Sequence, residues 1–294
     1  MRIQNSEFRI QKTKNKVETR RAASEIQNSK FRKGDSAALR LRNRIQNQYS
    51  MIDFSRYQRQ IILPDFGEEG QQKLLNASVL VVGVGGLGSV AALYLTAAGV
   101  GTIGLMDADT VALHNLQRQV LYREDEIGES KVEMAVNTLG RLNSQVKIVH
   151  YPFFLTPENA SDIIKDYDII IDCTDNYPTR YLINDTCVTL GKPFIYGSIG
   201  DTKGQLAVFN YQTPSANYRT LYPNEKELIA QGNINRGVMG VLPSVIASLQ
   251  VNEVVKMITG TGKVLKDTLF MIDLATWRHT NSTYPSKSKT LTTK

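Results

Sequence analysis

From residue 51 onwards, short apolar runs alternate with longer amphipathic stretches. Ser78 to Val82 is an uninterrupted apolar run, which is typical of a parallel strand covered on both faces, and Leu87 to Ala98 has helical spacing. Further strands are expected at 102–106, 146–149, 168–172 and 193–196, with helical patterns between them. This alternation predicts an α/β fold built on a doubly wound, Rossmann-like, mostly parallel sheet.

The second half of the chain departs from this alternation. Gln205 to Tyr211 has a strand pattern, but no crossover helix precedes it. Pro243 to Ile258 has helical spacing, and Gly260 is placed to end that helix. We therefore expect added antiparallel strands in the second half.

No charged residue occurs between Ala77 and Met106. A run of about 30 residues is long enough to cross a membrane as a helix. The run is divided, however, by glycines into a β-rich part, a turn and an Ala/Leu-rich helical part. A buried βαβ unit therefore explains it better, and we expect no membrane association.

Charge separates the first 50 residues from the rest. Residues 1–50 hold 13 Lys and Arg against 4 Asp and Glu, whereas residues 51–294 hold 22 against 24. The net charge of +7 thus belongs to the N-terminal segment, and the folded part is not expected to bind nucleic acid. The sequence predicts a disordered basic extension (1–50) and a single folded domain (51–294).

Repeats leave the origin of the extension open. Ile3-Gln4-Asn5-Ser6 recurs at Ile26 to Ser29, without a sustained apolar period. A disordered arm, upstream sequence translated ahead of a true start at Met51, and an Arg-rich transit peptide or nucleic-acid arm all remain possible. The two cysteines of the chain favour a reducing cytoplasm.

Four glycines follow the first strand, at Gly83, Gly85, Gly86 and Gly88. Glycines spaced in this way allow a tight turn, a close approach of the backbone to phosphate and close packing of the following helix. Asp107 ends the second strand, where a carboxylate commonly binds ribose hydroxyls. This much of the pattern suits NAD as well as ATP.

Polar residues after the second and fourth strands favour ATP. They include His114 to Gln119, Lys131 and Asp172 to Asn176, and the carboxyl ends of the strands place them together. Cations offset the charge that develops on phosphorus, and a carboxylate can hold Mg²⁺. A nicotinamide site has little need for so much charge.

These motifs, together with Arg56 to Gln60 and Asp107 to Val111, resemble the ThiF/MoeB/HesA family, the bacterial relatives of ubiquitin-activating enzymes. The resemblance runs from about Phe54 to about Ala275. It implies a homodimeric adenylyltransferase that uses ATP and Mg²⁺ to activate the C-terminal glycine of a ubiquitin-fold sulfur-carrier protein. Thiamine thiazole and molybdopterin biosynthesis both use such enzymes, and the sequence does not choose between them.

The resemblance also implies roles for single residues. Asp175 would be catalytic and hold Mg²⁺, Arg118 and Lys131 would contact phosphates, and Arg59 would reach across the dimer into the partner's site. Asp172 is expected to be structural. The expected nucleotide-binding residues are Gly83, Gly85, Gly86, Gly88, Asp107, Asp109, Asn115, Gln117, Arg118, Lys131, Asp175 and Asn176.

The chain departs from the family pattern in its cysteines. Many members carry two CxxC pairs for structural zinc, but the first segment reads Asn217-Tyr218-Arg219-Thr220-Leu221 here, and no cysteine follows Cys187. We expect no zinc, and a C-terminal segment (276–294) that either relies on apolar contacts such as those of Leu274 and Trp277 or frays. Residues 232–236 lack the cysteine that links some members to the carrier, and Cys173 and Cys187 are expected to be buried. A separate sulfurtransferase would then deliver the sulfur.

Three other functions remain as alternatives. The chain could adenylate a peptide or small metabolite, it could be a nucleotide-binding module that has lost its chemistry, or it could be an NAD(P) oxidoreductase. Exchange of pyrophosphate into ATP separates the two adenylating functions from the other two.

Overall fold

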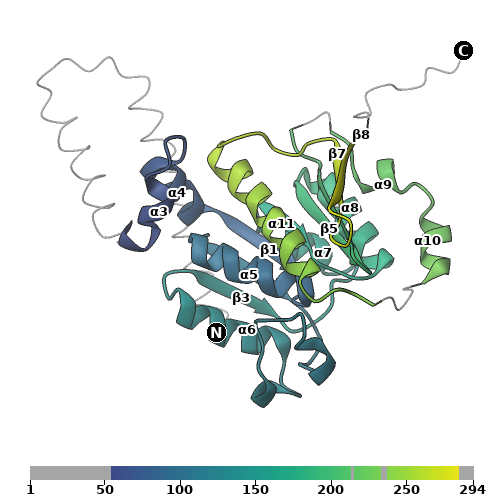
Figure 1. The fold of residues 1–294 in the computed structure, drawn as a ribbon, viewed down its shortest axis with the longest axis horizontal. Helices are drawn as coiled ribbons and strands as arrows, with labels where there is room; N and C mark the ends of the chain where they lie inside the picture. Colours follow the sequence, from purple (N-terminus) through teal and green to yellow (C-terminus); the bar gives the residue numbers. More distant parts are fainter. Residues whose placement is uncertain (1–53, 213–214, 233–236, 285–294) are drawn as a thin grey trace, which may run out of the picture. The chain divides into compact units, whose positions relative to one another are not determined.

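The computed structural model describes residues 54–212, 215–232 and 237–284 (Figure 1). The chain divides into two units, residues 1–56 and residues 57–294. The first unit is described only at Phe54–Arg56, in the 3-10 helix η1 (Phe54–Tyr57). The predicted extension at 1–50 lies outside the described residues, so its disorder stays a prediction.

The second unit is built on one sheet of eight strands, whose order is β3-β2-β1-β4-β5-β6-β7-β8. The first five strands in that order are parallel, and β5 to β8 pair antiparallel. The strands are β1 (Ser78–Val82), β2 (Thr102–Met106), β3 (Lys147–Tyr151), β4 (Ile169–Asp172), β5 (Phe194–Gly200), β6 (Lys203–Phe209), β7 (Thr268–Asp273) and β8 (Arg278–Thr283). The predicted Rossmann-like sheet with antiparallel strands in the second half is confirmed.

Helices cover both faces of the sheet. On the face toward the viewer in Figure 1, α5 and α11 pack on each other, α4 also packs on α11, and α6 packs on α5. On the other face α7 packs on α8, and α8 contacts both α9 and α10. The helices are α3 (Gln58–Ile61), α4 (Gly67–Asn76), α5 (Gly86–Ala98), α6 (Lys131–Leu142), α7 (Ala160–Ile164), α8 (Tyr177–Leu190), α9 (Tyr218–Leu221), α10 (Glu225–Gln231) and α11 (Leu242–Thr259), with short 3-10 turns η2 (Leu113–Asn115) and η3 (Glu124–Glu126).

The first strand shows why the apolar runs have no polar alternation. Val79 and Val81 belong to the apolar core under α5 and α11, whereas Leu80 and Val82 belong to the core under α7 and α8. Successive side chains of a strand point to opposite faces, so a sheet covered on both faces needs an apolar residue at each position.

The fifth strand is longer than its sequence pattern predicted. It continues from Tyr196 through Ser198 to Gly200, and it forms a hairpin with β6. Gly197 and Gly204 are required there, because a Cβ would lie 2.4 Å from Gln250 Nε2 at the first position and 2.4 Å from Ile246 Cδ1 at the second. Close packing of α11 on the hairpin therefore selects the glycines that resemble a loop in the sequence.

Two expectations from the sequence concern apolar segments. The contact expected for Trp277 is wrong, because its side chain is 79% exposed at the turn between β7 and β8, while Leu274 does pack on the core. In the part of the chain that the structure describes, no helix is long and apolar enough to cross a membrane. The uncharged run from Ala77 to Met106 forms β1, α5 and β2, as the βαβ interpretation predicted.

Candidate functional site

A cavity of about 750 Å³ lies at the carboxyl ends of β1, β2, β4 and β5. The strand order reverses between β1 and β4, which is the place where open α/β sheets bind ligands. Nine of the predicted site residues line this cavity: Gly83, Gly85, Gly86, Asp107, Asp109, Arg118, Lys131, Asp175 and Asn176.

The glycine loop follows β1 and leads into α5. Gly83 has φ +87°, and a Cβ there would lie 2.8 Å from the carbonyl oxygen of Cys173. No side chain caps the N-terminus of α5, which begins at Gly86. The amides of the first turn and the positive end of the helix dipole are therefore free to bind an anion such as phosphate.

Gly88 is placed differently from the other three glycines. It does not line the cavity, and a Cβ on it would lie 1.9 Å from the carbonyl oxygen of Gly83. Its lack of a side chain lets α5 pack against the loop, which fixes the path of the loop backbone.

Asp107 ties the glycine loop to the end of β2. Its Oδ2 accepts a hydrogen bond from the backbone N–H of Val84 at 2.7 Å, and its Oδ1 accepts one from Asp109 N–H at 2.9 Å. Each oxygen keeps a second lone pair, and the side chain lines the cavity. Asp107 can therefore order the loop and also accept from a ribose hydroxyl.

Lys131 and Asp109 form an ion pair at the edge of the cavity. Nζ of Lys131 lies 2.8 Å from Oδ2 of Asp109, and the side chains are 5% and 58% exposed. The backbone N–H of Lys131 also donates to the Asp109 carbonyl, at 3.0 Å. The first residue of α6 is thus fixed beside the cavity, where its ammonium can meet an anionic ligand.

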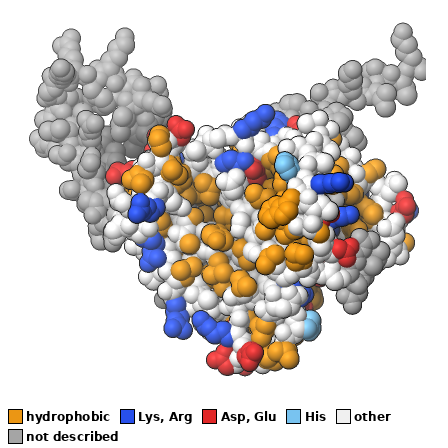
Figure 2. Space-filling view, in the orientation of Figure 1, with side chains coloured by type: hydrophobic (Ala, Val, Ile, Leu, Met, Phe, Trp, Pro, Cys, Tyr) orange, Lys and Arg blue, Asp and Glu red, His pale blue; other side chains and the backbone are white. Residues whose placement is uncertain are grey.

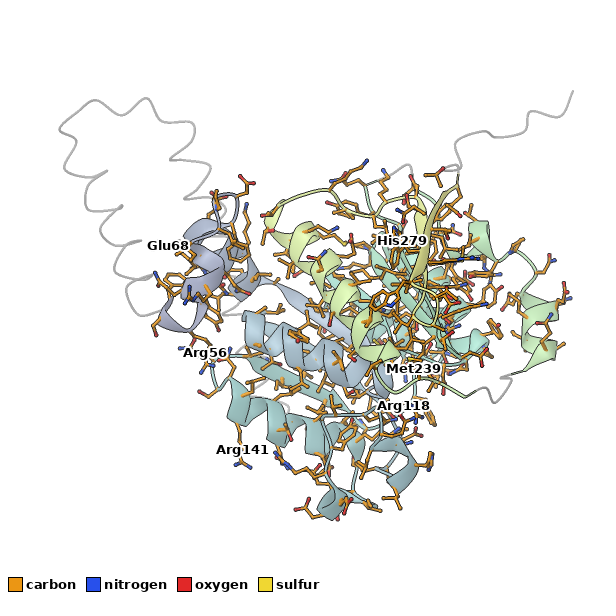
Figure 3. All side chains as sticks on the ribbon, in the orientation of Figure 1. Arg56, Glu68, Arg118, Arg141, Met239 and His279 are labelled. Carbon is orange, nitrogen blue, oxygen red and sulfur yellow. The ribbon has the colours of Figure 1, made fainter. Side chains whose placement is uncertain are left out.

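The segment after η2 places Arg118 and Gln119 in the cavity. The buried Asn115 supports both residues, because its carbonyl accepts their backbone N–H groups at 3.0 and 2.9 Å. Gln117 is exposed and lies against Gly240 instead. Figure 3 shows Arg118 close to the segment that carries Met239. Asn115 and Gln117, which were both predicted to bind the nucleotide, therefore do not line the cavity.

The turn between β4 and α8 holds Asp175. Oδ1 of Asp172 accepts from both Thr174 N–H, at 2.9 Å, and Thr174 Oγ1, at 2.7 Å, while Arg180 Nη2 donates to the Thr174 carbonyl at 2.8 Å. The side chain of Asn176 caps α8 by accepting from Thr179 N–H at 3.0 Å. This fixed turn leaves the carboxylate of Asp175 exposed at the cavity.

Asp172 is fully buried, as its expected structural role requires. Burial raises the pKa of its carboxyl group, and the nearby Arg180 guanidinium opposes that shift. The partly compensated charge makes the pair sensitive to the loss of either residue.

Sequence reasoning missed several residues of the cavity. Arg180 lies within the helical pattern of α8, and the sequence did not single it out. Gln119 belongs to the motif from His114 to Gln119, but no role was predicted for it. Ser198 and Lys203 lie on the β5–β6 hairpin between the predicted strands 193–196 and 205–211, and Gln205 is the first residue of the second predicted strand. Glycines at 197, 200 and 204 obscure the strand pattern of this hairpin, so the local sequence carries no clear signal for these residues.

Arg59 and Cys187 lie outside the cavity, whereas Cys173 lines it. Arg59 is exposed on α3 and does not line the cavity. The predicted burial of Cys173 and Cys187 is confirmed. Burial raises the pKa of both thiols, which disfavours the reactive thiolate. Residues 233–236, where some relatives carry a reactive cysteine, lie outside the described residues.

The side chains of the cavity suit Mg²⁺ better than an ion that needs a cage of protein ligands. The described residues contain no group of three or more His, Cys, Asp or Glu suited to a metal ion. Mg²⁺ needs fewer protein ligands, because it is commonly held by one or two carboxylates together with substrate phosphates. Asp175 could supply such a carboxylate. Zinc does not fit at 217–220: Asn217 and Thr220 replace the two cysteines, and they form a reciprocal capping box at α9.

Comparison with known proteins gives a consistent result. The model of the ThiF family matches residues 57–292. The chain is 45% identical to the sulfur carrier protein adenylyltransferase of Thermus thermophilus over 77% of this chain and 85% of that protein. It is 46% identical to the adenylyltransferase and sulfurtransferase MOCS3-1 of maize, over 74% of this chain and 47% of that protein. The chain thus spans about half the length of the maize relative.

Solved structures support the fold. Escherichia coli MccB superimposes with a TM-score of 0.71 at 19% identity, covering 89% of this chain and 82% of that one. PaaA superimposes with a TM-score of 0.68 at 23% identity, covering 90% of this chain and 89% of that one. At such identities the likeness concerns the arrangement of helices and strands.

Proposed function

The chain belongs to the ThiF family, and we propose that it is an adenylyltransferase which uses ATP and Mg²⁺ to activate the C-terminal glycine of a ubiquitin-fold sulfur-carrier protein. One observation carries the proposal: a single cavity combines the uncapped helix terminus at Gly86 with Arg118, Lys131 and Asp175. The relatives named as adenylyltransferases add support.

Asp107 and the glycine loop would hold ribose and phosphates, and the guanidinium of Arg118 and ammonium of Lys131 would stabilise charge that develops on the α-phosphate. When bound at Asp175, Mg²⁺ would supply further positive charge to the phosphates. The protein needs no nucleophile of its own for this reaction, because positioning and electrostatics suffice.

The carboxylate of the carrier is the nucleophile in the proposed reaction. One of its oxygens forms a bond to the α-phosphorus of ATP, and the bond from that phosphorus to the oxygen bridging to the β-phosphate breaks. Pyrophosphate leaves with the electron pair, and an acyl-adenylate forms. Since the carboxylate is already ionised at neutral pH, the step needs no general base.

A homodimer is part of the proposal. Figure 2 shows exposed apolar side chains across the face that α5 and α11 cover, and Tyr94, Met239 and Val241 are 55%, 41% and 59% exposed. Such surfaces favour contact with another protein. In the proposed dimer, Arg59 of each copy would reach into the cavity of the other copy.

Sulfur delivery is assigned to a separate sulfurtransferase in the cytoplasm. Cys173 and Cys187 are buried free thiols, and burial raises the pKa of each, so neither is suited to attack the adenylate.

Exchange of labelled pyrophosphate into ATP tests the proposed activity. We expect label in ATP only when a carrier ending in Gly-Gly is added with Mg²⁺. Exchange with a peptide or small metabolite in its place would favour adenylation of that substrate. Absence of exchange with every acceptor, in a protein that binds ATP, would favour a nucleotide-binding module without this chemistry.

A further inference from the structure

Arg180 is a buried cation in the wall of the cavity. It lies in the first turn of α8, its residue is 7% exposed, and its guanidinium carbon is 5.3 Å from the ring centroid of Tyr196 and 5.8 Å from that of Tyr177. Because burial removes most of its water, this arginine depends on the protein or a ligand for hydrogen-bond acceptors.

The acceptors that the protein supplies are incomplete. Nη2 donates to the Thr174 carbonyl at 2.8 Å, but Nε has no hydrogen-bond partner among the described residues. Oδ2 of Asp172 lies 3.8 Å from Nε, and that oxygen is likewise without a hydrogen-bond partner there. Asp172 thus balances the charge of Arg180, and the side chain of Tyr218 also interacts with it. These contacts and the hydrogen bond to Thr174 do not use all five N–H groups of the guanidinium.

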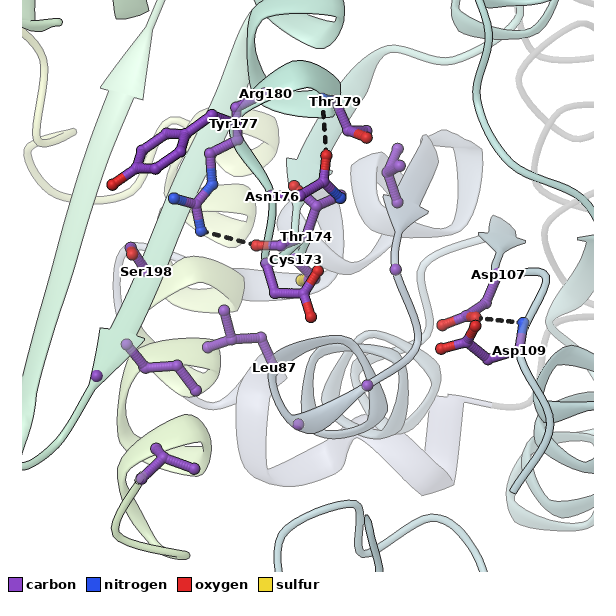
Figure 4. Close-up of a pocket in the computed structure, with 18 of the residues that line it drawn as sticks. Leu87, Asp107, Asp109, Cys173, Thr174, Asn176, Tyr177, Thr179, Arg180 and Ser198 are labelled. Carbon is purple, nitrogen blue, oxygen red and sulfur yellow. Dashed lines mark hydrogen bonds between the residues drawn. The ribbon is translucent and has the colours of Figure 1, made fainter. Parts of the chain in front are cut away.

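The position of Arg180 within the cavity indicates which part of a ligand its guanidinium could bind. Figure 4 shows its guanidinium on the side of Tyr177 and Ser198, across the Thr174 turn from Asp107 and Asp109. The glycine loop, Asp107 and Lys131 account for the nucleotide in the proposed function. The part of the cavity that remains for the acyl acceptor is therefore the part that Arg180 lines.

We propose that Arg180 binds the terminal carboxylate of the acceptor and orients it for attack on the α-phosphorus, an inference that rests on the proposed function. Guanidinium groups bind carboxylates through two parallel N–H···O bonds, and the low dielectric of a buried site strengthens such contacts. Each carboxylate oxygen has more than one lone pair, so an oxygen that accepts an N–H can still attack. Arg180 would thereby select acceptors that end in a free carboxylate.

The test compares two forms of one carrier, one ending in the Gly-Gly carboxylate and one ending in its carboxamide. Calorimetry should show that the wild-type protein, loaded with a non-hydrolysable ATP analogue, binds the carboxylate at least tenfold more tightly. The double variant Asp172→Asn/Arg180→Gln removes both buried charges together and keeps an oxygen that can accept from Thr174. It should bind the two forms equally, with affinity for the ATP analogue unchanged within about twofold.

A merely structural role for Arg180 would give a different result, because distortion of the Thr174 turn would weaken ATP and both carrier forms together. Lys165→Gln is the matched control, since it removes a cation that lies outside the cavity, and it should keep the preference. If the double variant does not fold, Arg180→Lys is the second variant. It keeps the positive charge but removes the paired N–H donors of the guanidinium, and it should lose most of the preference for the carboxylate over the carboxamide.

Three results would overturn the inference: equal binding of both forms by the wild-type protein, a full preference in the folded double variant, or a full preference in Arg180→Lys. In each case pyrophosphate exchange that depends on the carrier would leave the proposed function standing. If neither form binds and no exchange occurs, the proposed function fails and this inference with it.

Discussion

Nζ of Lys131 lies 2.8 Å from Oδ2 of Asp109, so the most buried lysine of the cavity wall is held by a carboxylate that solvent still reaches. Asp109 can therefore release the ammonium to a phosphate at little cost, because water can solvate the freed carboxylate. The pair keeps Lys131 oriented before the nucleotide binds.

Lys131→Ala should lower the rate of adenylation by about 100-fold, a typical loss for one stabilising donor. Its melting temperature should stay close to that of the wild type, because the remaining Asp109 is more than half exposed. Lys165→Ala removes an exposed ion pair with Asp162 and serves as the control, with no change expected in the rate. Wild-type turnover in Lys131→Ala would exclude the lysine from the reaction.

Asp175→Asn should lose adenylation by several orders of magnitude and remain folded. The exposed carboxylate contributes little to packing, but an amide binds Mg²⁺ more weakly than a carboxylate does. Exchange rates measured across a range of Mg²⁺ concentrations test this, with Asp162→Asn as an exposed control outside the cavity. Near-normal exchange at low Mg²⁺ would remove Asp175 from the metal site.

Two glycine substitutions should have opposite effects. Gly88→Ala would place a methyl group 1.9 Å from the Gly83 carbonyl, so the phosphate-binding loop must shift, and we expect at least a tenfold loss of ATP affinity and a lower melting temperature. In α6, Gly140 has nothing within 4 Å of an added Cβ. Gly140→Ala should stabilise the protein by about 0.5 to 1 kcal/mol. Equal ATP affinity in the two variants would contradict the role given to Gly88.

The sheet and most of the site follow from local patterns. The apolar runs located β1 and β2 because both faces are buried, and the glycine spacing located the phosphate loop. The β5–β6 hairpin did not follow, because Gly197 and Gly204 are selected by contact with α11, which lies far along the chain. Arg180 was missed for a related reason: its chemistry depends on Asp172 and Thr174 across the β4–α8 turn.

Arg59 provides a test of the homodimer. It lies outside the cavity of its own chain, so we expect it to act in the partner's cavity. Arg59→Ala and Asp175→Asn should each be inactive alone. Hybrid dimers hold one site in which both residues are intact, so mixing the two should restore part of the activity. No recovery, despite subunit exchange shown by native mass spectrometry, would rule out action in trans.

Acid should weaken the attachment of α9 to α8. Arg219 Nε and Nη2 donate to the two carboxylate oxygens of Asp185 at 2.7 and 2.6 Å, and these hydrogen bonds lower the pKa of Asp185. A lowered pKa means that this stabilisation is present above the ordinary aspartate value of about 3.9 and is lost as the pH falls through the lower, folded-state value.

The Asp185→Asn variant measures the contribution of this pair. Because both side chains are more than a third exposed, the pair should contribute at most about 1 kcal/mol. Melting curves should show a smaller gap between wild type and variant at pH 3 than at pH 6. A gap that widens in acid would contradict the assigned direction of the pKa shift.

The central claim is that the cavity forms an acyl-adenylate on a carrier protein. The most direct measurement is intact-protein mass spectrometry of a Gly-Gly carrier after incubation with this protein, ATP, Mg²⁺ and a pyrophosphatase, quenched without reductant. The account predicts a carrier heavier by one adenylyl group at its C-terminal glycine, and no such product with Asp175→Asn. An unmodified carrier, under conditions in which the protein binds both ATP and the carrier, would contradict the account.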